Sequence, residues 1–368
     1  MPERALARIR PGAVERNCAR LRRELAAGAR LCAVVKADGY GHGAVTCARA
    51  AVAGGADYLA VATAEEAAEL RRHRLTGRIL VMGALTAGEV RTALEAEADV
   101  VVWSLDFAGA LGRQGGPPPR VHVKLDTGMG RLGTSDPDEA RAVAAAAASD
   151  DRLELVGVMT HFATADELGD SHFPHQLERF RAFVTDMRRE HPDLLAHAAN
   201  SAATLRDTAS HFDMVRCGVA VYGLDPFQED AARRDLEPVL GLESYVAAVR
   251  RFEAGASAGY GRRWTAREPT FVATLPIGYG DGWRRDLTNN SDVLIRGRRH
   301  PLVGTVSMDN VTVDLGPETD VVVGDAAVLI GVQGDERIPC EEVARRIGTI
   351  NYEITCGLSS RVRRAEER

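Results

Sequence analysis

Short apolar runs alternate with helical patterns through the first part of the chain. Segments 13–25 and 175–189 show apolar residues at helical spacing. Eight strand-plus-helix units within roughly 220 residues match the dimensions of a (β/α)₈ barrel, so an α/β fold with an N-terminal TIM-type barrel is predicted. A doubly wound sheet is the alternative that this pattern leaves open. The eight strand candidates are Leu31–Val35, Tyr58–Ala62, Ile79–Met82, Asp99–Trp103, Val121–Asp126, Leu155–Thr160, Leu194–Ala198 and Met214–Val219.

The pattern changes after Leu224. A charged linker leads to apolar runs separated by Gly, Asn and Asp turns, with a single short helix expected at Glu341–Arg346. We therefore predict a barrel over residues 1–235 and a mostly β C-terminal domain over residues 236–368. Residues 1–10, which include a strand candidate, can pair with either domain. The C-terminal strand candidates are Thr270–Pro276, Val293–Arg296, Pro301–Leu315 and Val321–Ile330.

Composition limits the class of protein further. Of 368 residues, 45% are hydrophobic and 27% charged, which excludes a disordered chain. The formal net charge is -6 with both signs interspersed, so no nucleic-acid partner is expected. The arginine-bearing N-terminus lacks an apolar run, and no stretch approaches the ~20 apolar residues of a membrane span. We therefore expect neither a secretion signal nor a membrane segment.

The cysteines point to a compartment. None forms a C-x-x-C pair, and they lie among apolar neighbours, which is typical of buried thiols in a reducing cytoplasm. Disulfides and metal ligands are not expected. The six are Cys18, Cys32, Cys47, Cys217, Cys340 and Cys356.

Lysine is almost absent. The chain has 46 basic residues besides histidine, and all except Lys36 and Lys124 are arginine. A guanidinium cannot form an imine and is effectively never deprotonated, so these two lysines are candidates for work that requires a primary amine.

Unusual polar residues follow the predicted strands at their carboxyl ends, where barrel enzymes carry their chemistry. The run 121–126 alternates, so Lys124 should point into the barrel mouth together with His122 and Asp126. The residues at strand ends are Lys36, Arg131, His161, Asn200, Ser201, Arg216 and Gly218.

These residues carry a family resemblance that runs nearly end to end and in order. The chain resembles alanine racemases, which implies a pyridoxal 5′-phosphate enzyme that acts as a homodimer with shared active sites. The strings that carry the resemblance are AVVKADGYGHGA, VHVKLDTGMGRLG, GVMTHFATAD, ANSAATL, VRCGVAVYGL, GYGRRW, PIGYGDGWRR, VGTVSMDN and GTINYEITCGLSSRV.

The resemblance implies a two-base interconversion of L-alanine and D-alanine. Lys36 resembles the lysine that forms an imine with the cofactor and serves as one base, and the partner subunit's Tyr260 resembles the other. A phenol with an ordinary pKa near ~10 needs nearby positive charge, which His161 and Arg216 would supply. Arg216 would also discourage protonation of the pyridine nitrogen. The implied cofactor contacts are Lys36, Tyr40, His161, Asn200, Ser201, Arg216, Gly218, Val219 and Tyr352.

The resemblance also implies a substrate site. Arg131 and the Met308 amide would bind the carboxylate, and Lys124 would carry a carbamate that holds Arg131. The residues that would narrow the pocket or line its entrance are Asp309, Tyr279, Tyr352 and Arg285.

Three positions depart from the family pattern without touching the implied bases: Cys217, Ser307 and Thr305. A racemase of another small amino acid such as serine remains an alternative, as does a barrel-type pyridoxal phosphate decarboxylase, although Arg216 argues against the latter. A non-catalytic pyridoxal phosphate carrier would lack the second domain. The sequence leaves open whether the role is cell-wall supply, alanine breakdown or a specialised biosynthesis.

Overall fold

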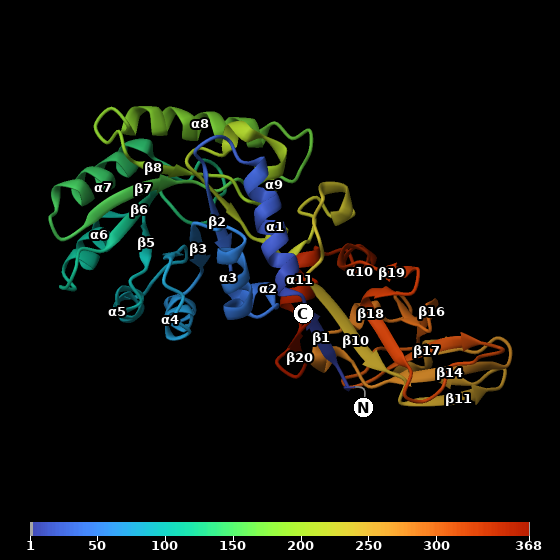
Figure 1. Ribbon diagram of the computed structural model, residues 1–368. Helices are drawn as coiled ribbons and strands as arrows, with labels where there is room; N and C mark the ends of the chain where they lie inside the picture. Colours follow the sequence, from blue (N-terminus) through green and yellow to red (C-terminus); the bar gives the residue numbers. More distant parts are fainter. Residues whose placement is uncertain (1–2, 368) are drawn as a thin grey trace. The chain divides into compact units, whose positions relative to one another are not determined.

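The computed structural model describes residues 3–367, which form two compact units (Figure 1). One unit comprises residues 14–221, and the other comprises residues 222–367 with residues 3–13. The units divide between Val221 and Tyr222, whereas the sequence pattern places the boundary at 235/236.

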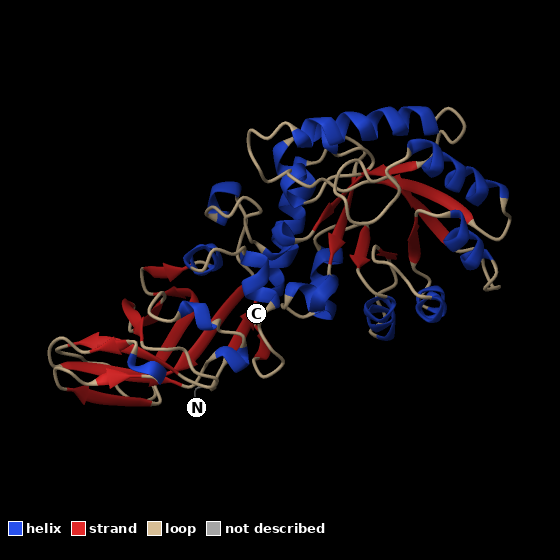
Figure 2. Cartoon of the chain, turned by 180° about the vertical axis from the view of Figure 1, so that it is seen from behind, coloured by secondary structure: helices blue, strands red, loops and turns tan. Residues whose placement is uncertain are grey.

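Eight parallel strands of the first unit close into a barrel in chain order, with helices around the outside (Figure 2). This confirms the predicted (β/α)₈ architecture. Strands β3 and β5 are buried at every position, as expected where both faces of a parallel strand are covered. The strands are β2 (Arg30–Val34), β3 (Tyr58–Val61), β4 (Arg78–Val81), β5 (Asp99–Val102), β6 (Arg120–Lys124), β7 (Glu154–Met159), β8 (Leu195–His197) and β9 (Met214–Cys217).

Local sequence signals start several of the helices. Thr63 and Glu66 form a capping box, and Thr86 and Glu89 form another, so two early helices begin where side chains satisfy their first N–H groups. The helices are α1 (Pro11–Glu24), α2 (Lys36–Tyr40), α3 (Ala44–Ala53), α4 (Ala64–Arg72), α5 (Ala87–Glu95), α6 (Leu105–Gly112), α7 (Pro137–Ser149), α8 (His172–Met187) and α9 (Ser201–Arg206). Within residues 3–367, none of the helices combines the length and apolar character that crossing a membrane requires.

The turn after β2 is strained. Ala37, Asp38 and Tyr40 all have left-handed backbone, which L-residues adopt at a cost of roughly 1–2 kcal/mol each. Asp38 stabilises the turn because its Oδ1 accepts the Ala44 N–H at 2.9 Å. Strain of this kind concentrates at functional sites, and here it holds Lys36 and Tyr40 at the carboxyl end of the barrel.

The second unit is mostly β, as predicted. Its sheet runs β11-β14-β17-β16-β15-β18-β10-β1-β20, with β19 paired to β18 and a separate β12-β13 hairpin. Strands β10 and β17 alternate between buried and half-buried positions, the pattern of a sheet with one covered face. The strands are β1 (Leu6–Ile9), β10 (Leu240–Tyr245), β11 (Ala248–Phe252), β12 (Ser257–Ala258), β13 (Trp264–Thr265), β14 (Thr270–Leu275), β15 (Asp292–Ile295), β16 (Arg298–Val303), β17 (Val311–Gly316), β18 (Ala326–Gln333), β19 (Glu336–Ile338) and β20 (Arg363–Glu366).

Three details differ from the sequence pattern or complete it. The run 301–315 is two strands, β16 and β17, joined by a loop. A second helix, α11 (Asn351–Cys356), follows the expected one, which is α10 (Cys340–Arg346). Strand β1, which the sequence left unassigned, lies between β10 and β20.

A buried carboxylate ties the chain's first segment into this unit. The Asp281 side chain is fully buried and accepts hydrogen bonds from Arg4 Nη1 at 2.9 Å and from the Gly278 N–H at 3.0 Å. Burial alone would raise the pKa of Asp281, but the bonds from Arg4 and Gly278 and the charge of Arg361 outweigh it and hold the pKa below its ordinary value.

We expect Asp281→Asn to reduce the free energy of unfolding by roughly 2 kcal/mol at neutral pH, because a neutral amide accepts these bonds poorly. The lowered pKa means that the carboxylate stabilises the fold above its unfolded pKa, and that this stabilisation is lost as the pH falls through the folded value. The difference between wild type and variant should therefore close in acid. Urea unfolding followed by tryptophan fluorescence, to which the buried Trp283 contributes, measures this difference. Asp286→Asn, at an exposed position, is the control, and equal losses in both variants would contradict the expectation.

Candidate functional site

Basic side chains gather at the carboxyl end of the barrel. Lys124 is buried with 4% of its surface exposed, as its predicted inward direction requires. Burial, followed by the charges of Arg216, Arg131 and Lys36, lowers the pKa of Lys124 to about 8. A substantial fraction of this amine is therefore neutral near physiological pH.

Arg216 is the most completely held member of this group. Its Nη1 donates to His197 Nδ1 at 2.9 Å, and its Nη2 donates to the Thr160 carbonyl at 2.8 Å and the Ala198 carbonyl at 3.0 Å. Nη2 also lies 3.1 Å from His161 Nδ1. Burial lowers the pKa of Arg216 to about 10, so the guanidinium remains charged at neutral pH.

His161 is a neutral imidazole. Burial and then the charges of Arg216, Arg131, Lys124 and Lys36 hold its pKa well below the ordinary value. Because Nδ1 accepts from Arg216, the ring proton is on Nε2. The positive charge of this pair thus belongs to Arg216, while His161 offers an N–H donor.

Tyr40, Ser201 and Gly218 come together from three segments. Ser201 Oγ accepts the Gly218 N–H at 3.0 Å and the Ala220 N–H at 3.3 Å, so its own hydrogen is left to donate. A Cβ added at Gly218 would lie 2.3 Å from Tyr40 Oη, so the glycine is required by the tyrosine. Val219 follows, buried at 1% exposure. Two hydroxyls against a bare glycine form a donor set suited to a phosphate ester.

Asn200 has a local structural role in this cluster. Its Oδ1 accepts the Ala203 N–H at 2.9 Å, which makes it the N-cap of α9. The cap fixes the helix start and therefore the position of Ser201.

Asp126 organises the loop that carries Arg131, a function that the sequence reasoning missed. Its carboxylate accepts the N–H groups of four consecutive residues, 128–131, at 2.7–3.3 Å. Burial would raise the pKa of Asp126, but these bonds hold it below the ordinary value. The signal was available in the sequence as an acid placed directly before the glycine-rich string TGMGR.

Gln176 on α8 is a second positioning residue that no motif singled out. Its Nε2 donates to the His161 carbonyl at 3.1 Å and its Oε1 accepts the Ala163 N–H at 2.8 Å. The segment from His161 to Ala163, which follows β7, is thereby hydrogen-bonded to α8.

In the second unit, Tyr260 lies at the tip of the β12-β13 hairpin with 74% of its surface exposed. Thr305, one of the three departures from the family pattern, donates to the Tyr260 carbonyl at 2.6 Å. A Cβ at Gly259 would lie 2.9 Å from the Thr305 nitrogen, so the glycine permits this close approach. The hairpin presents the phenol outward.

Two loops of the same unit bring Tyr279, Met308 and Asp309 together. The Tyr279 N–H donates to the Ser307 carbonyl at 3.0 Å, and the Gly280 N–H donates to the Met308 carbonyl at 2.9 Å. The Asp309 carboxylate pairs with Arg361 at 2.6 Å. Met308 and Tyr279 are 51% and 42% exposed, so this edge of the unit is open.

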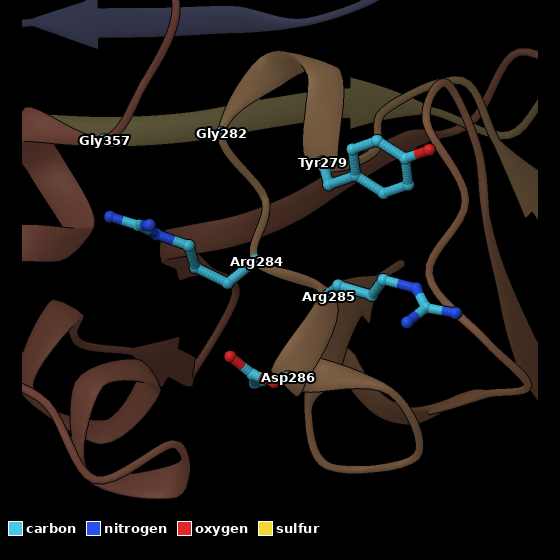
Figure 3. A pocket seen from close by; sticks show the side chains of 6 residues that line it. All are labelled: Tyr279, Gly282, Arg284, Arg285, Asp286 and Gly357. Carbon is cyan, nitrogen blue, oxygen red and sulfur yellow. The ribbon is translucent and has the colours of Figure 1, made fainter.

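A pocket of about 350 Å³ adjoins these loops and is lined by Tyr279, Arg284 and Arg285 among others. Figure 3 shows the two arginines extending in opposite directions, with the Arg285 guanidinium on the same side as the Tyr279 ring. Tyr352 is half-buried on α11. This helix is anchored by Asn351, whose Nδ2 donates to the Asp225 carbonyl and to a Glu341 carboxylate oxygen, each at 2.9 Å.

The expected site residues therefore fall into two groups, each assembled within one unit. None of the six cysteines, all within the described residues, forms a disulfide; five are buried and Cys356 is exposed, contrary to the sequence expectation. Across residues 3–367, no three His, Cys, Asp or Glu side chains are placed to hold a metal ion. The barrel carries Lys36, Tyr40, Lys124, Arg131, His161, Asn200, Ser201, Arg216, Gly218 and Val219, and the second unit carries Tyr260, Tyr279, Arg285, Met308, Asp309 and Tyr352.

Known proteins match over both units. Family models for the N-terminal and C-terminal domains of alanine racemase match residues 9–226 and 239–366. The chain is 44% identical to the alanine racemase of Symbiobacterium thermophilum over 356 residues, which cover 96% of this chain and 94% of that protein. It matches alanine racemase from D-cycloserine producing Streptomyces lavendulae with a TM-score of 0.95 and 38% identity, covering 100% and 98% of the two chains. The Bacillus anthracis alanine racemase with bound L-Ala-P gives 0.91 and 35%, covering 100% and 96%.

The lowered pKa of Lys124 can be measured directly because the chain has only two lysines. Lysine labelled with ¹³C at Cε gives two side-chain signals in cofactor-free protein. We expect one to titrate near pH 8, because burial beside Arg216 and Arg131 disfavours the ammonium. Lys124→Arg should remove that signal. Titration of the removed signal near the ordinary value of about 10.4 would contradict the expectation.

Proposed function

The chain belongs to the alanine racemase family, and from that membership we propose that it is an isomerase that interconverts L-alanine and D-alanine with bound pyridoxal 5′-phosphate. The observation that carries the proposal is the arrangement at the barrel's carboxyl end. Two primary amines, Lys36 and Lys124, lie within electrostatic range of the hydrogen-bonded pair of Arg216 and His161.

When bound, the cofactor supplies an electron-withdrawing ring that accepts the negative charge left by removal of the substrate's α-proton. Lys36 offers the amine that would hold it. The hydroxyls of Tyr40 and Ser201 would bind its phosphate beside Gly218, with Val219 and Tyr352 completing the set. The fixed charge of Arg216 would keep a proton off the ring nitrogen.

Inversion of a carbon centre requires a base on each face, because one base returns its proton to the side from which it took it. Lys36 Nζ is the base on one face. The partner subunit's Tyr260 would be the base on the other, in a homodimer with shared sites. The 74% exposure of Tyr260 supports this assignment, since the outward phenol is accessible to a second chain. Arg216 would stabilise the phenolate through the neutral His161.

The substrate is expected to be small. We assign its carboxylate to Arg131 and the Met308 amide, and the walls and entrance of its pocket to Asp309, Tyr279, Tyr352 and Arg285. Serine remains a neighbouring candidate because pocket size depends on these loops. A decarboxylase is disfavoured by the basic Arg216, and a non-catalytic carrier by the second domain.

Lys124 is proposed to carry a carbamate that orients Arg131. A carbamate forms only on a neutral primary amine, so the pKa of about 8 supports this assignment. Carbamylation also converts a buried cation into an anion beside Arg131 and Arg216, which relieves like-charge repulsion.

The cellular setting is inferred from the cysteines. Six cysteines without a disulfide suit a reducing cytoplasm. D-alanine supply for the cell wall is one role that the proposed reaction would serve.

We expect Lys36→Ala to reduce racemisation by about a thousandfold or more, because the only other lysine, Lys124, is buried and is assigned to the carbamate. Conversion of L-alanine to D-alanine provides the rate. Borohydride reduction followed by denaturation provides a second readout, since it leaves the cofactor attached to its lysine. Lys124→Arg should keep the attached cofactor and Lys36→Ala should lose it; retention in Lys36→Ala would refute the assignment.

The shared site can be tested by mixing two inactive variants. In a random mixture of Lys36→Ala and Tyr260→Ala, each heterodimer holds one doubly altered site and one intact site, so activity should return to about a quarter of wild type. If Tyr260 acts within its own chain, every site keeps one defect. Subunit exchange is verified by mass-tagged chains. A mixture that exchanges and remains inactive eliminates the shared site.

A further inference from the structure

A line of buried polar groups crosses the barrel interior behind Arg216. Asp99 Oδ2 on β5 accepts from His122 Nε2 on β6 at 3.3 Å. His122 Nδ1 lies 2.9 Å from His197 Nε2 on β8, and His197 Nδ1 lies 2.9 Å from Arg216 Nη1 on β9. The side chains of Asp99 and both histidines are fully buried. Neither Asp99 nor His122 has a role in the reaction proposed above.

The hydrogen-bond donors and acceptors along this line determine which ring nitrogen of each histidine carries the proton. An arginine only donates, so His197 Nδ1 must accept and its proton is on Nε2. His197 Nε2–H then donates to His122 Nδ1, which leaves the His122 proton on Nε2, facing Asp99. Both imidazoles are thus neutral and point their N–H groups toward the carboxylate. Burial, then the charge of Arg216, holds the pKa of His197 well below the ordinary value, in agreement with this protonation.

Two arginines lie against Asp99 at the end of the line farthest from Arg216. The position of His122 depends on the absence of a side chain at Gly157. Asp99 Oδ1 accepts from Arg120 Nε at 3.1 Å, and Arg78 Nη1 lies 3.9 Å away. A Cβ at Gly157 on β7 would lie 2.6 Å from His122 Nδ1. The glycine therefore leaves the space in which His122 reaches His197.

We propose that Asp99 and His122 are positioning residues that orient the Arg216 guanidinium through His197, and that this orientation keeps the proposed racemase from transferring the substrate's amino group to its cofactor. The proposal rests on the proposed function. Asp99 fixes the His122 proton on Nε2, this fixes the His197 proton on Nε2, and His197 Nδ1 is thereby kept as an acceptor for Arg216.

Asp99→Asn should reverse the direction of the hydrogen bonds along the line, because asparagine has nearly the same shape as aspartate but carries an N–H donor. The Asn oxygen stays with Arg120, so its NH₂ faces His122 Nε2 and forces the His122 proton to Nδ1. His197 must then accept at Nε2 and carry its proton on Nδ1, against the Arg216 N–H. Two N–H donors, His197 Nδ1–H and Arg216 Nη1–H, then face each other. We expect the guanidinium to turn away from His197 while keeping its bonds to the Thr160 and Ala198 carbonyls and to His161.

The first measurement uses cofactor-free protein and ¹⁵N-labelled histidine rings. Wild type should show His122 and His197 as neutral Nε2–H tautomers, assigned by single His→Gln variants. Asp99→Asn should move the His197 proton to Nδ1. A wild-type Nδ1–H tautomer or imidazolium at either ring overturns the proposal, whether or not the variant folds.

The second measurement uses loaded enzyme and compares racemisation with amino transfer. In the latter, the amino group of alanine passes to the cofactor, which becomes pyridoxamine phosphate, while alanine leaves as pyruvate. The number of racemisation events per pyruvate should fall about tenfold in Asp99→Asn, the scale of coupling that remote contacts provide. Asp99→Glu should restore part of it.

Val102→Ala is the matched control, because Val102 is buried on the same strand but pairs with Val123, and its side chain is on the opposite face of the strand from Asp99. It should lower stability and leave both the tautomers and the ratio unchanged. A ratio that falls equally in Val102→Ala, or that stays constant in an Asp99→Asn protein with reversed tautomers, overturns the proposal. If wild type fails to racemise alanine, the proposed function is wrong. The tautomer measurement still tests whether Asp99 sets the tautomers of His122 and His197.

Discussion

A buried guanidinium is stable only if its N–H groups have hydrogen-bond acceptors. Arg216 has 3% of its surface exposed, so these acceptors must come from the residues at the carboxyl end of the barrel. The acceptors are two main-chain carbonyls, Thr160 and Ala198, and two imidazole nitrogens. They come from the ends of two neighbouring strands, so the close pairing of β7, β8 and β9 is what satisfies the charge. The arrangement of side chains at this end of the barrel, including the ring orientation of His161, follows from one buried cation that keeps its proton at neutral pH.

The same charge shapes the chemistry of its neighbours. Burial, and after it this charge, lowers the pKa of Lys124 and that of His161. The Asp126 carboxylate in the loop accepts four backbone N–H groups. This end of the barrel is therefore electropositive, which favours anionic groups such as those proposed for the cofactor, the substrate and Lys124. Burial and this positive charge together make part of the Lys124 amine neutral near pH 8, where an ordinary lysine is almost fully charged.

Periodicity and position in the sequence were enough to predict the barrel and to place Lys36, His161 and Arg216 at strand ends. The loop between β16 and β17 was not predicted because VGTVSMDNVTV keeps its apolar residues at short spacing through the turn. Helix α11 was not predicted because its six residues are too few to show a helical period. The line from Asp99 to His197 could not be read from the chain at all. Its members lie on three strands, and which side chains meet inside a barrel depends on the stagger between strands.

Strand β1 lies between β10 and β20, so the first and last strands of the chain are hydrogen-bonded neighbours. Arg8 and its partner Glu243 are 235 residues apart in sequence. In chain order the barrel segments lie between β1 and both of its neighbours, so during synthesis they emerge before β10 or β20 exists. The β1 segment therefore lacks its sheet partners while the barrel segments emerge, and its pairing is complete only once β20 has been made. The β1 segment carries Arg4, Arg8 and Arg10, and charged side chains of this kind disfavour pairing of an exposed strand edge with other strands.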